Sequence, residues 1–401
     1  MMKNLRIICL LILTANFCTF NFSQPRQENC TSAVISAEGS ANGAPILWKN
    51  RDTLLLSNKV VYVKESPYSY LALVNANSDS GRVSYAGLNS VGFAIMNTVG
   101  YNLPKKSDEM KDLEGFIMAD ALRTCRSVED FERFIKANLG PDLGSLANFG
   151  VIDAGGRAVI FEIHNHGYKI FDSLQTPEKY LVNTNFARSG KPDKGAGYLR
   201  FERATELFKT FSPGKVAFEP ILCQFTRDVG HVLVKHPRLD DLKNVPAQQD
   251  LWISTADCIN KRYTSAAVVI IDKNPNDKDS RATMWVIPGE PVCAIALPLW
   301  VEAGMPPEAF WKGKKAPLWE ESLRIKDIIR PLKGGSRRNY LNLTKLDNAE
   351  GTGFLPKILE VEQEILKMTR TFLQKKRSSS ELAEFQTRMA QKALQLLRSI
   401  N

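Results

Sequence analysis

The stretch CTSAVISAEGSANGAPILWKNRD, residues 30–52, decides the fold. Two apolar runs, Ala33–Ser36 and Pro45–Trp48, flank an Ala-Asn-Gly turn, and Asn-Gly favours a tight hairpin because both residues accept positive φ. A hairpin of this kind returns the end of its second strand, Lys49-Asn50-Arg51-Asp52, to the neighbourhood of Cys30. The stretch therefore predicts a thiol and a carboxylate near each other at one end of an antiparallel strand pair.

The segment before Cys30 has the pattern of a cleavable leader. Two cationic residues precede an apolar run over residues 7–22, which is too short and too weakly apolar to span a bilayer comfortably. We expect residues 1–23 to be a signal peptide and residues 24–29 to be a short propeptide. The mature protein is then secreted or periplasmic, and Cys30 becomes its first residue.

An N-terminal cysteine carries a nucleophile and a base on one residue. A free thiol titrates near ~8.5 and an α-amine at roughly 7.7–8.0, so the amine can take the thiol proton at working pH. Two other interpretations stay open. Cys30 could be a structural cysteine in a disulfide, or a lipid-attachment site, although neither Cys18 nor Cys30 follows the small residues that lipoprotein processing needs.

Composition limits the class of protein. The 401 residues are 44% hydrophobic, enough for one large domain or two, and the net charge of +10 falls to +8 when the cationic residues of the leader are lost. The basic runs around residues 312–315 and 370–377 have no interleaved aromatic residues, so we expect solvated faces and no nucleic-acid partner. Once the leader is removed, five cysteines remain. Because five is odd, at least one thiol stays without a disulfide partner within the chain. Disulfides stay open among the other four cysteines: Cys125, Cys223, Cys258 and Cys293.

Periodicity predicts a β-rich first part and a helical end. Among the expected elements are a strand over Val292–Leu297 and helices with apolar residues at three- and four-residue spacing. The expected helices are Gly115–Thr124, Val128–Asn138, Tyr198–Phe211, Leu355–Leu373 and Ser379–Ser399. We expect residues 30–311 to form one domain and residues 312–401 to form a C-terminal extension that ends in a helical hairpin. No second apolar span follows the leader, so we expect no transmembrane anchor.

Four further residues are candidates for a site with Cys30. Asp52 ends the second strand and could hold the thiol or the α-ammonium. Asn97 ends a later strand and Asn185 follows another, and each amide could donate a hydrogen bond to an oxyanion, which is typically worth ~10²–10³ in rate. Arg200 opens the helix expected from Tyr198. Taken singly, each of these residues also fits an ordinary structural role.

The order of these residues resembles a known family. Cys30 with the strand end Trp48–Asp52, then Gly87–Asn97, Val182–Phe186 and Leu199–Arg203, is similar to N-terminal-nucleophile (Ntn) cysteine hydrolases of the isopenicillin-N acyltransferase and carcinine hydrolase type. Choloylglycine hydrolase, penicillin V acylase and acid ceramidase are related families. The resemblance runs from Cys30 to about residue 297.

The resemblance implies an α+β fold, the αββα four-layer sandwich of two antiparallel sheets. It also implies that Cys30 attacks a linear, non-peptide amide, that a thioester forms, and that water or a second amine opens it, which makes the protein a hydrolase or an acyltransferase. Cys30 would be exposed autocatalytically. Asp52 and Arg200 would orient the nucleophile, while Asn97 and Asn185 would bind the oxyanion. The substrate would be a small acyl amide, with no metal or organic cofactor; an oligomer stays open.

One position departs from the family pattern. The related hydrolases with a Gly-Arg-Asn-x-Asp strand end carry Arg where this chain has Lys49, and Trp48 replaces the Gly. Lys and Arg differ as anion ligands because only Arg offers a planar, bidentate fork. We expect Lys49 and Asn50 to contact substrate, or Lys49 to take no part in the chemistry.

Two other functions stay open. Glu162, His164 and His166 share one face of a strand by their period of two, which could make a zinc site, although satisfied or solvent-facing histidines are more common. The second alternative is a secreted binding protein that has the same fold and no activity. A protein that had lost its activity would be expected to have lost Cys30, Asp52 or Arg200, and this chain retains all three.

Overall fold

The computed structural model describes residues 28–78, 81–105 and 111–400. The expected signal peptide and the expected propeptide up to residue 27 lie outside the described residues. Within the described part of the chain, none of the helices combines the length and the apolar character needed to cross a bilayer.

The first sheet carries the predicted hairpin in its middle. It has six strands in the order β10-β1-β2-β12-β13-β14. β1 and β2 pair in antiparallel register, with Thr31 opposite Asn50, so the two strand ends meet as predicted. The strands are β1 (Thr31–Ile35), β2 (Ile46–Asp52), β10 (Tyr180–Asn183), β12 (Thr264–Ile271), β13 (Thr283–Ile287) and β14 (Leu297–Leu299).

The second sheet has seven strands joined consecutively, β3 to β9, and every neighbouring pair is antiparallel. Its strands are β3 (Asn58–Val63), β4 (Tyr70–Asn75), β5 (Ala86–Asn89), β6 (Ala94–Val99), β7 (Leu146–Ile152), β8 (Ala158–His164) and β9 (Gly167–Asp172). A small third sheet pairs β11 (Trp252–Ser254) with β15 (Tyr340–Asn342). β1 and β2 contact β6, β7 and β8, which places the two large sheets face to face.

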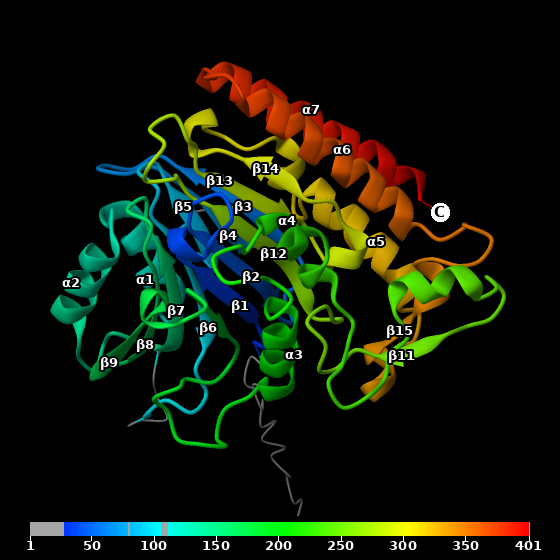
Figure 1. Cartoon of the computed structure of the whole chain (residues 1–401), viewed down its shortest axis with the longest axis horizontal. Coiled ribbons are helices and arrows are strands. Elements are labelled where there is room, and N and C mark those ends of the chain that lie inside the picture. Colours follow the sequence, from blue (N-terminus) through cyan, green and yellow to red (C-terminus); the bar gives the residue numbers. More distant parts are fainter. Residues whose placement is uncertain (1–27, 79–80, 106–110, 401) are drawn as a thin grey trace, which may run out of the picture.

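Helices cover both outer faces of the paired sheets (Figure 1). α1 and α2 lie outside the second sheet, and the remaining helices gather on the side of the first sheet. The helices are α1 (Glu114–Thr124), α2 (Val128–Asn138), α3 (Tyr198–Phe208), α4 (Phe218–Cys223), α5 (Pro317–Ile329), α6 (Leu355–Leu373) and α7 (Ser379–Ser399). The four layers confirm the predicted fold class, an α+β sandwich of αββα type.

Local sequence explains where several of these elements begin and end. Ser127 caps α2 by accepting a hydrogen bond from the Asp130 N–H, as the sequence predicted. The strand expected over Val292–Leu297 is wrong, because Pro291 starts a 3₁₀ turn over Pro291–Cys293 and β14 begins only at Leu297. In this turn the Cys293 N–H donates to the Glu290 carbonyl at 2.7 Å instead of to a neighbouring strand. β14 is the edge strand of the sheet, where its own Pro298 is tolerated.

The strand β2 is buried over its whole length, although it contains four polar residues. Successive side chains of a strand point to opposite faces. Lys49 and Arg51 point between the two sheets, whereas Asn50 and Asp52 point toward the helices that cover the first sheet. Polar groups are buried at this depth only when they are paired, so β2 marks the place where the core contains a site.

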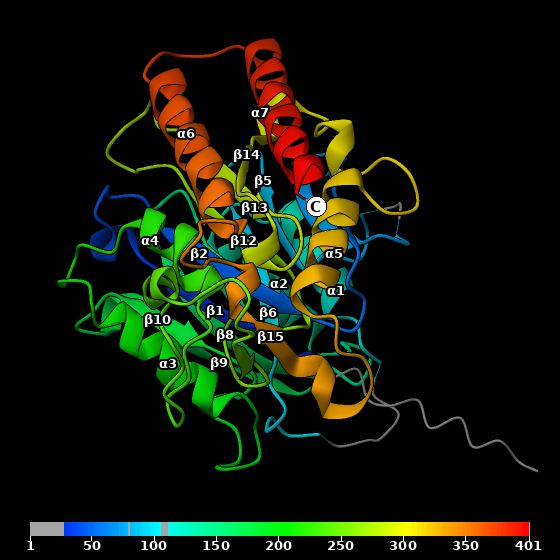
Figure 2. The same ribbon diagram turned by 90° about the vertical axis from the view of Figure 1, so that its right-hand side faces the viewer.

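The C-terminal helices belong to the packing of the first sheet. α6 and α7 lie next to each other (Figure 2), and both contact β14. A buried ion pair fastens α6: Arg227 donates to both carboxylate oxygens of Glu362, at 2.9 and 2.7 Å. The same Glu362 accepts from the Ala296 N–H, so one carboxylate joins α6 to the segment that leads into β14.

Breaking this ion pair should cost stability. In a Glu362→Gln variant the Arg227 guanidinium stays buried without its counter-charge, so we expect the free energy of unfolding to fall by about 3–5 kcal/mol. Urea denaturation of the purified protein measures this. The control is Glu364→Gln on the same helix, whose carboxylate pairs with Lys392 at the surface, where the loss should stay below about 1 kcal/mol. Equal losses in the two variants would contradict a structural role for the buried pair.

Candidate active site

Cys30 lies directly before β1, in the interior of the molecule. Its exposed fraction is 0%. The Asn29 N–H donates to the Asp52 carbonyl, so the pairing of β1 with β2 continues through residues 30 and 51. The Thr31 hydroxyl accepts from the Arg200 guanidinium on the helix side of the first sheet. Because neighbouring side chains of a strand point to opposite faces, the Cys30 thiol faces the space between the two sheets, as Lys49 and Arg51 do.

Lys49 is the cation beside the thiol. Its ammonium is fully buried and donates to the Tyr85 carbonyl and to the Asn97 Oδ1 atom, each at 2.8 Å. β6 thus brings Asn97 into the same inter-sheet space as the nucleophile. Because Lys49 donates to the oxygen of the Asn97 amide, the NH₂ end of that amide is oriented away from Lys49 and can act as a donor.

Arg200 ties Asn185 to the start of β1. From the first turn of α3, its Nη1 donates to the Cys30 carbonyl at 2.5 Å and to the Thr31 hydroxyl at 2.9 Å. Its Nη2 donates to Asn185 Oδ1 at 2.9 Å. The Asn185 NH₂ donates to the Val99 carbonyl at 3.3 Å, which leaves one further N–H on that nitrogen. The guanidinium fixes the backbone at Cys30 and the position of the second amide.

Asp52 lies on the opposite face of β2 from the thiol, and its carboxylate is held there. Lys261 Nζ lies 3.0 Å from Asp52 Oδ2, and the Thr264 hydroxyl donates to Oδ1 at 2.7 Å. The expectation that Asp52 orients the nucleophile therefore takes an indirect form: its backbone pairs with Asn29 and its carboxylate balances nearby cations. The burial of Lys261 lowers the pKa of its ammonium to about 8, although the Asp52 charge opposes this shift.

Burial and the nearby Lys49 charge shift the pKa of the Cys30 thiol in opposite directions. Burial raises the pKa of the Cys30 thiol, and the Lys49 charge is the first effect that lowers it. A hydrogen bond from the Asp52 backbone also favours the thiolate, whereas the Glu28 carboxylate disfavours it. In the same way burial lowers the pKa of Lys49, and the negative charge on Cys30 raises it. The Cys30 thiolate and the Lys49 ammonium therefore each stabilise the charged form of the other.

Asn50, like the Asp52 carboxylate, lies on the opposite face of β2 from the thiol. Its NH₂ donates to the carbonyls of Thr226 and Ile259, and its Oδ1 accepts from the Trp48 indole. These contacts place Asn50 under the helical layer, on the far face of β2. Its role in this structure is to tie the first sheet to the chain segments above it.

The residues directly before Cys30 occupy the site. Glu28 offers its carbonyl to the Tyr101 hydroxyl at 2.8 Å, and its carboxylate lies 3.8 Å from Arg51. Together with the bond from Asn29 to Asp52, these contacts hold the chain across the thiol. Residues 28 and 29 therefore lie beside the buried thiol.

Sequence reasoning missed three residues of this site: Arg51, Tyr101 and Lys261. Arg51 stands in the quoted strand end, and only the burial of both faces of β2 distinguishes it from a surface charge. Tyr101 follows Asn97 by four residues and carried no pattern. Lys261 lies in the loop before β12 and contacts Asp52 because β2 pairs with β12. The local sequence does not predict that pairing.

The histidines of the alternative zinc site are placed differently from a metal centre. The buried Glu162 carboxylate accepts hydrogen bonds from the Arg188 and Ser189 N–H groups and from the Ser189 hydroxyl. The His166 N–H donates to His164 Nδ1 within the turn. Among residues 28–78, 81–105 and 111–400, no three His, Cys, Asp or Glu side chains gather as a metal site.

The other cysteines are separate from the site. In the described part of the chain, five cysteines are buried and none forms a disulfide. The disulfide interpretation of Cys30 therefore has no partner thiol within these residues. Burial raises the pKa of Cys125 and Cys258 to about 12, which keeps those thiols protonated and unreactive.

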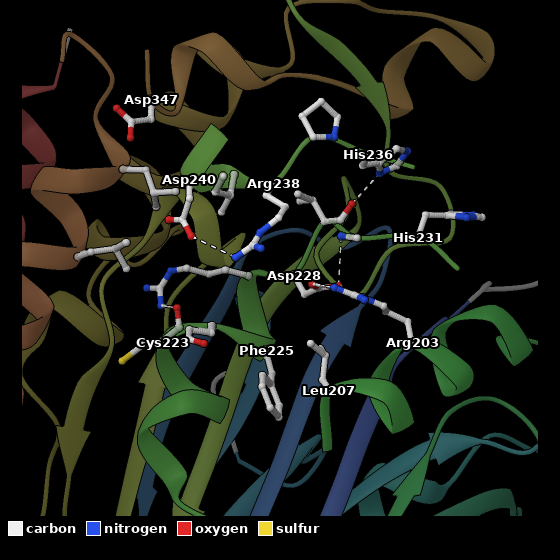
Figure 3. Close-up of a pocket in the computed structure, with 18 of the residues that line it drawn as sticks. Arg203, Leu207, Cys223, Phe225, Asp228, His231, His236, Arg238, Asp240 and Asp347 are labelled. Atoms are coloured by element: carbon white, nitrogen blue, oxygen red, sulfur yellow. Dashed lines mark hydrogen bonds and ion pairs between the residues drawn. The ribbon is translucent and has the colours of Figure 1, made fainter. Parts of the chain in front are cut away.

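A cavity of about 840 Å³ lies beside α3 and the first turn of α6 (Figure 3). Arg203 and Asp228 point toward each other at its edge and form a bidentate pair at 2.9 and 2.8 Å. His231 and His236 line its rim. None of the candidate residues around Cys30 lines this cavity.

No family model and no curated protein matches the chain. Among solved structures, the Caenorhabditis elegans N-acylethanolamine-hydrolyzing acid amidase ortholog aligns with 16% identity and a TM-score of 0.39, over 63% of this chain and 95% of that one. A penicillin V acylase from Agrobacterium tumefaciens aligns with 16% identity and a TM-score of 0.40, over 67% and 85%. A variant of the conjugated bile acid hydrolase from Clostridium perfringens gives 11% identity and a TM-score of 0.39, over 65% and 89%.

Proposed function

We propose that this protein is an amide hydrolase of the Ntn cysteine type, with Cys30 as its N-terminal nucleophile. The observation that carries the proposal is the setting of Cys30: a buried thiol beside Lys49, with its carbonyl held by Arg200 and two amides, Asn97 and Asn185, nearby. A purely structural cysteine needs no cation beside it. Burying an ammonium is costly unless it stabilises a negative charge, such as a thiolate.

The first reaction is removal of the leader. The Cys30 sulfur attacks the Asn29 carbonyl carbon, the C–N bond of the Asn29–Cys30 peptide breaks, and the thiol proton passes to the departing Cys30 nitrogen. Water then adds to the thioester and releases the leader with a new carboxylate on Asn29. The thiol returns, now next to a free α-amine.

The second reaction repeats this chemistry on a substrate. The α-amine takes the thiol proton, the sulfur attacks an amide carbonyl, and the amine product leaves with a proton. The NH₂ groups of Asn97 and Asn185 stabilise the oxyanion. Loss of Glu28 with the leader removes one of the two carboxylates that raise the pKa of the Cys30 thiol, the other being Asp52, so cleavage favours the thiolate as well as exposing it.

Acyl transfer is the same reaction with a different second step. If an amine in place of water opens the thioester, the site becomes an acyltransferase of the isopenicillin-N acyltransferase or carcinine hydrolase type. We further propose that residues 1–23 direct the chain out of the cytoplasm and that self-cleavage follows. Added primary amines that divert product from the free acid to a new amide would distinguish transfer from hydrolysis.

Intact mass and N-terminal sequence of the purified protein test the proposal. The expected mature chain begins at Cys30, and a small acyl amide then forms a covalent thioester on that residue, seen as a mass increase equal to the acyl group. A chain that retains residues 24–29 and gains no mass from any amide would overturn the proposal. The alternative of a binding protein without activity would then take its place.

A further inference from the structure

The Arg51 side chain is buried between the sheets next to the thiol, with an exposed fraction of 1%. Its Nη1 donates to Asn58 Oδ1, and its Nη2 donates to Asn75 Oδ1 at 2.8 Å. The Tyr85 ring lies under the guanidinium, 3.5 Å from its carbon. These contacts fix the plane of the guanidinium but do not neutralise it, because each partner is uncharged.

The one carboxylate that pairs with Arg51 belongs to the leader. Among residues 28–78, 81–105 and 111–400, its ion pair is with Glu28, at 3.8 Å. Within the same residues, Arg51 Nε is buried without a hydrogen-bond partner. Lys49, the second cation of this space, is also fully buried, and it forms no ion pair with a carboxylate of the described residues. Of the carboxylates in the described part of the chain, Glu28 alone pairs with a cation on this face of β2, and removal of the leader takes it away.

The leader lies where an acyl group must lie. In the proposed self-cleavage, Glu28-Asn29 is the acyl part of the amide that Cys30 attacks. A substrate of the mature protein presents its carbonyl to the same sulfur, so its acyl part extends along the same path toward Arg51. A buried guanidinium without a counter-charge is unfavourable, and an anionic ligand that pairs with it removes this cost.

We propose that the substrates are amides whose acyl part carries a carboxylate, and that this carboxylate replaces Glu28 on Arg51. The inference rests on the proposed function and adds the substrate class to it. The carboxylate is separated from the scissile carbonyl by about the chain length that separates the Glu28 carboxylate from the Asn29 carbonyl. Arg51 is then the residue that determines acyl specificity.

A matched pair of substrates tests the inference on the processed wild-type protein. Acetyl-Glu-Asn para-nitroanilide copies the leader, and acetyl-Gln-Asn para-nitroanilide differs only in an uncharged side chain. We expect kcat/KM to be roughly 10- to 100-fold higher for the Glu compound, because a hydrogen bond to a charged group typically changes binding by a factor of this size. Equal values for the two compounds, or a preference for Gln, would overturn the inference.

Two variants assign the preference to Arg51. Arg51→Met should abolish it, and Asn75→Asp should do so without touching Arg51, because the new carboxylate is placed 2.8 Å from Nη2 and neutralises it. Asn138→Asp adds the same charge on exposed α2 and should leave the preference intact. A preference that survives in Asn75→Asp would also overturn the inference.

The two proposals fail in different ways. If mature protein starting at Cys30 hydrolyses neutral amides as well as anionic ones, the anionic-acyl inference is wrong and the amidase proposal stands. If the chain keeps its leader and turns over neither compound nor any other amide, the proposed function itself is wrong.

Discussion

A Cys30→Ala variant is expected to keep the residues before position 30 and to show no amide turnover. The thiol is the only group in the proposed mechanism that forms a bond to the carbonyl carbon, so its loss removes both self-cleavage and catalysis. Intact mass reports the first effect, and product release from an acyl amide reports the second. Activity should fall to background, the largest effect expected for any single substitution in this chain.

The matched control is Cys293→Ala. Cys293 is also fully buried, and burial raises the pKa of its thiol well above the ordinary value, so it takes no part in nucleophilic chemistry. This variant should be processed and active, with a modest loss of stability from the small cavity. If Cys30→Ala is cleaved at residue 29 all the same, another protease removes the leader; if it also retains activity, the nucleophile lies elsewhere.

A Lys49→Met variant should lose most of its activity while keeping the thiol. Burial raises the pKa of Cys30 and the Lys49 charge lowers it, so removing that charge shifts the titration of the thiol to higher pH. A nearby opposite charge shifts a pKa by about 1–3 units, so the thiolate fraction at neutral pH, and with it kcat/KM, should fall roughly 10- to 1,000-fold. Self-cleavage should slow by a similar factor.

The pH profile of thiol alkylation separates this effect from misfolding. In mature wild-type protein the rate of iodoacetamide reaction with Cys30 rises with pH to a plateau, and in Lys49→Met the rise should move to higher pH. Lys49→Arg keeps the positive charge and places at this position the residue that the related hydrolases carry, so it should retain a profile close to wild type. An unchanged profile in Lys49→Met would show that the ammonium does not act on the thiol.

The fold was predictable because its deciding contacts are local. β1 and β2 are neighbours in the sequence, so their antiparallel pairing, and with it the meeting of Cys30 with the end of β2, could be predicted from residues 30–52 alone. The tight Asn-Gly hairpin was wrong in detail, because the connection covers residues 36–45 and includes a 3₁₀ turn over Ala37–Gly39. The cap of α2 at Ser127 is local in the same way. The arrangement of Asn97, Asn185 and Arg200 around this hairpin followed from the family resemblance rather than from periodicity.

The rest of the site depends on contacts between distant residues. Thr264 and Asp52 lie 212 positions apart, and their meeting requires the pairing of β2 with β12. The role of Arg51 was hidden for a different reason: alternation shows which side chains share a face, but it cannot show that both faces of β2 are buried. A Lys-Asn-Arg-Asp run at a strand end normally indicates that the strand is exposed to solvent there. In this protein the run is buried and forms part of the candidate site.

The order of strands in the first sheet has a consequence for biosynthesis. β1 and β2 emerge early from the ribosome, yet their neighbours β10 and β12 are made much later, and Arg200 meets Cys30 across 170 positions. In a nascent chain, Cys30 therefore lacks the contacts that surround it in the folded protein until most of the chain has been translated. If Cys30 acts as proposed, the timing of synthesis alone should keep it inactive until then, and the first bond that it breaks should be the Asn29–Cys30 peptide bond.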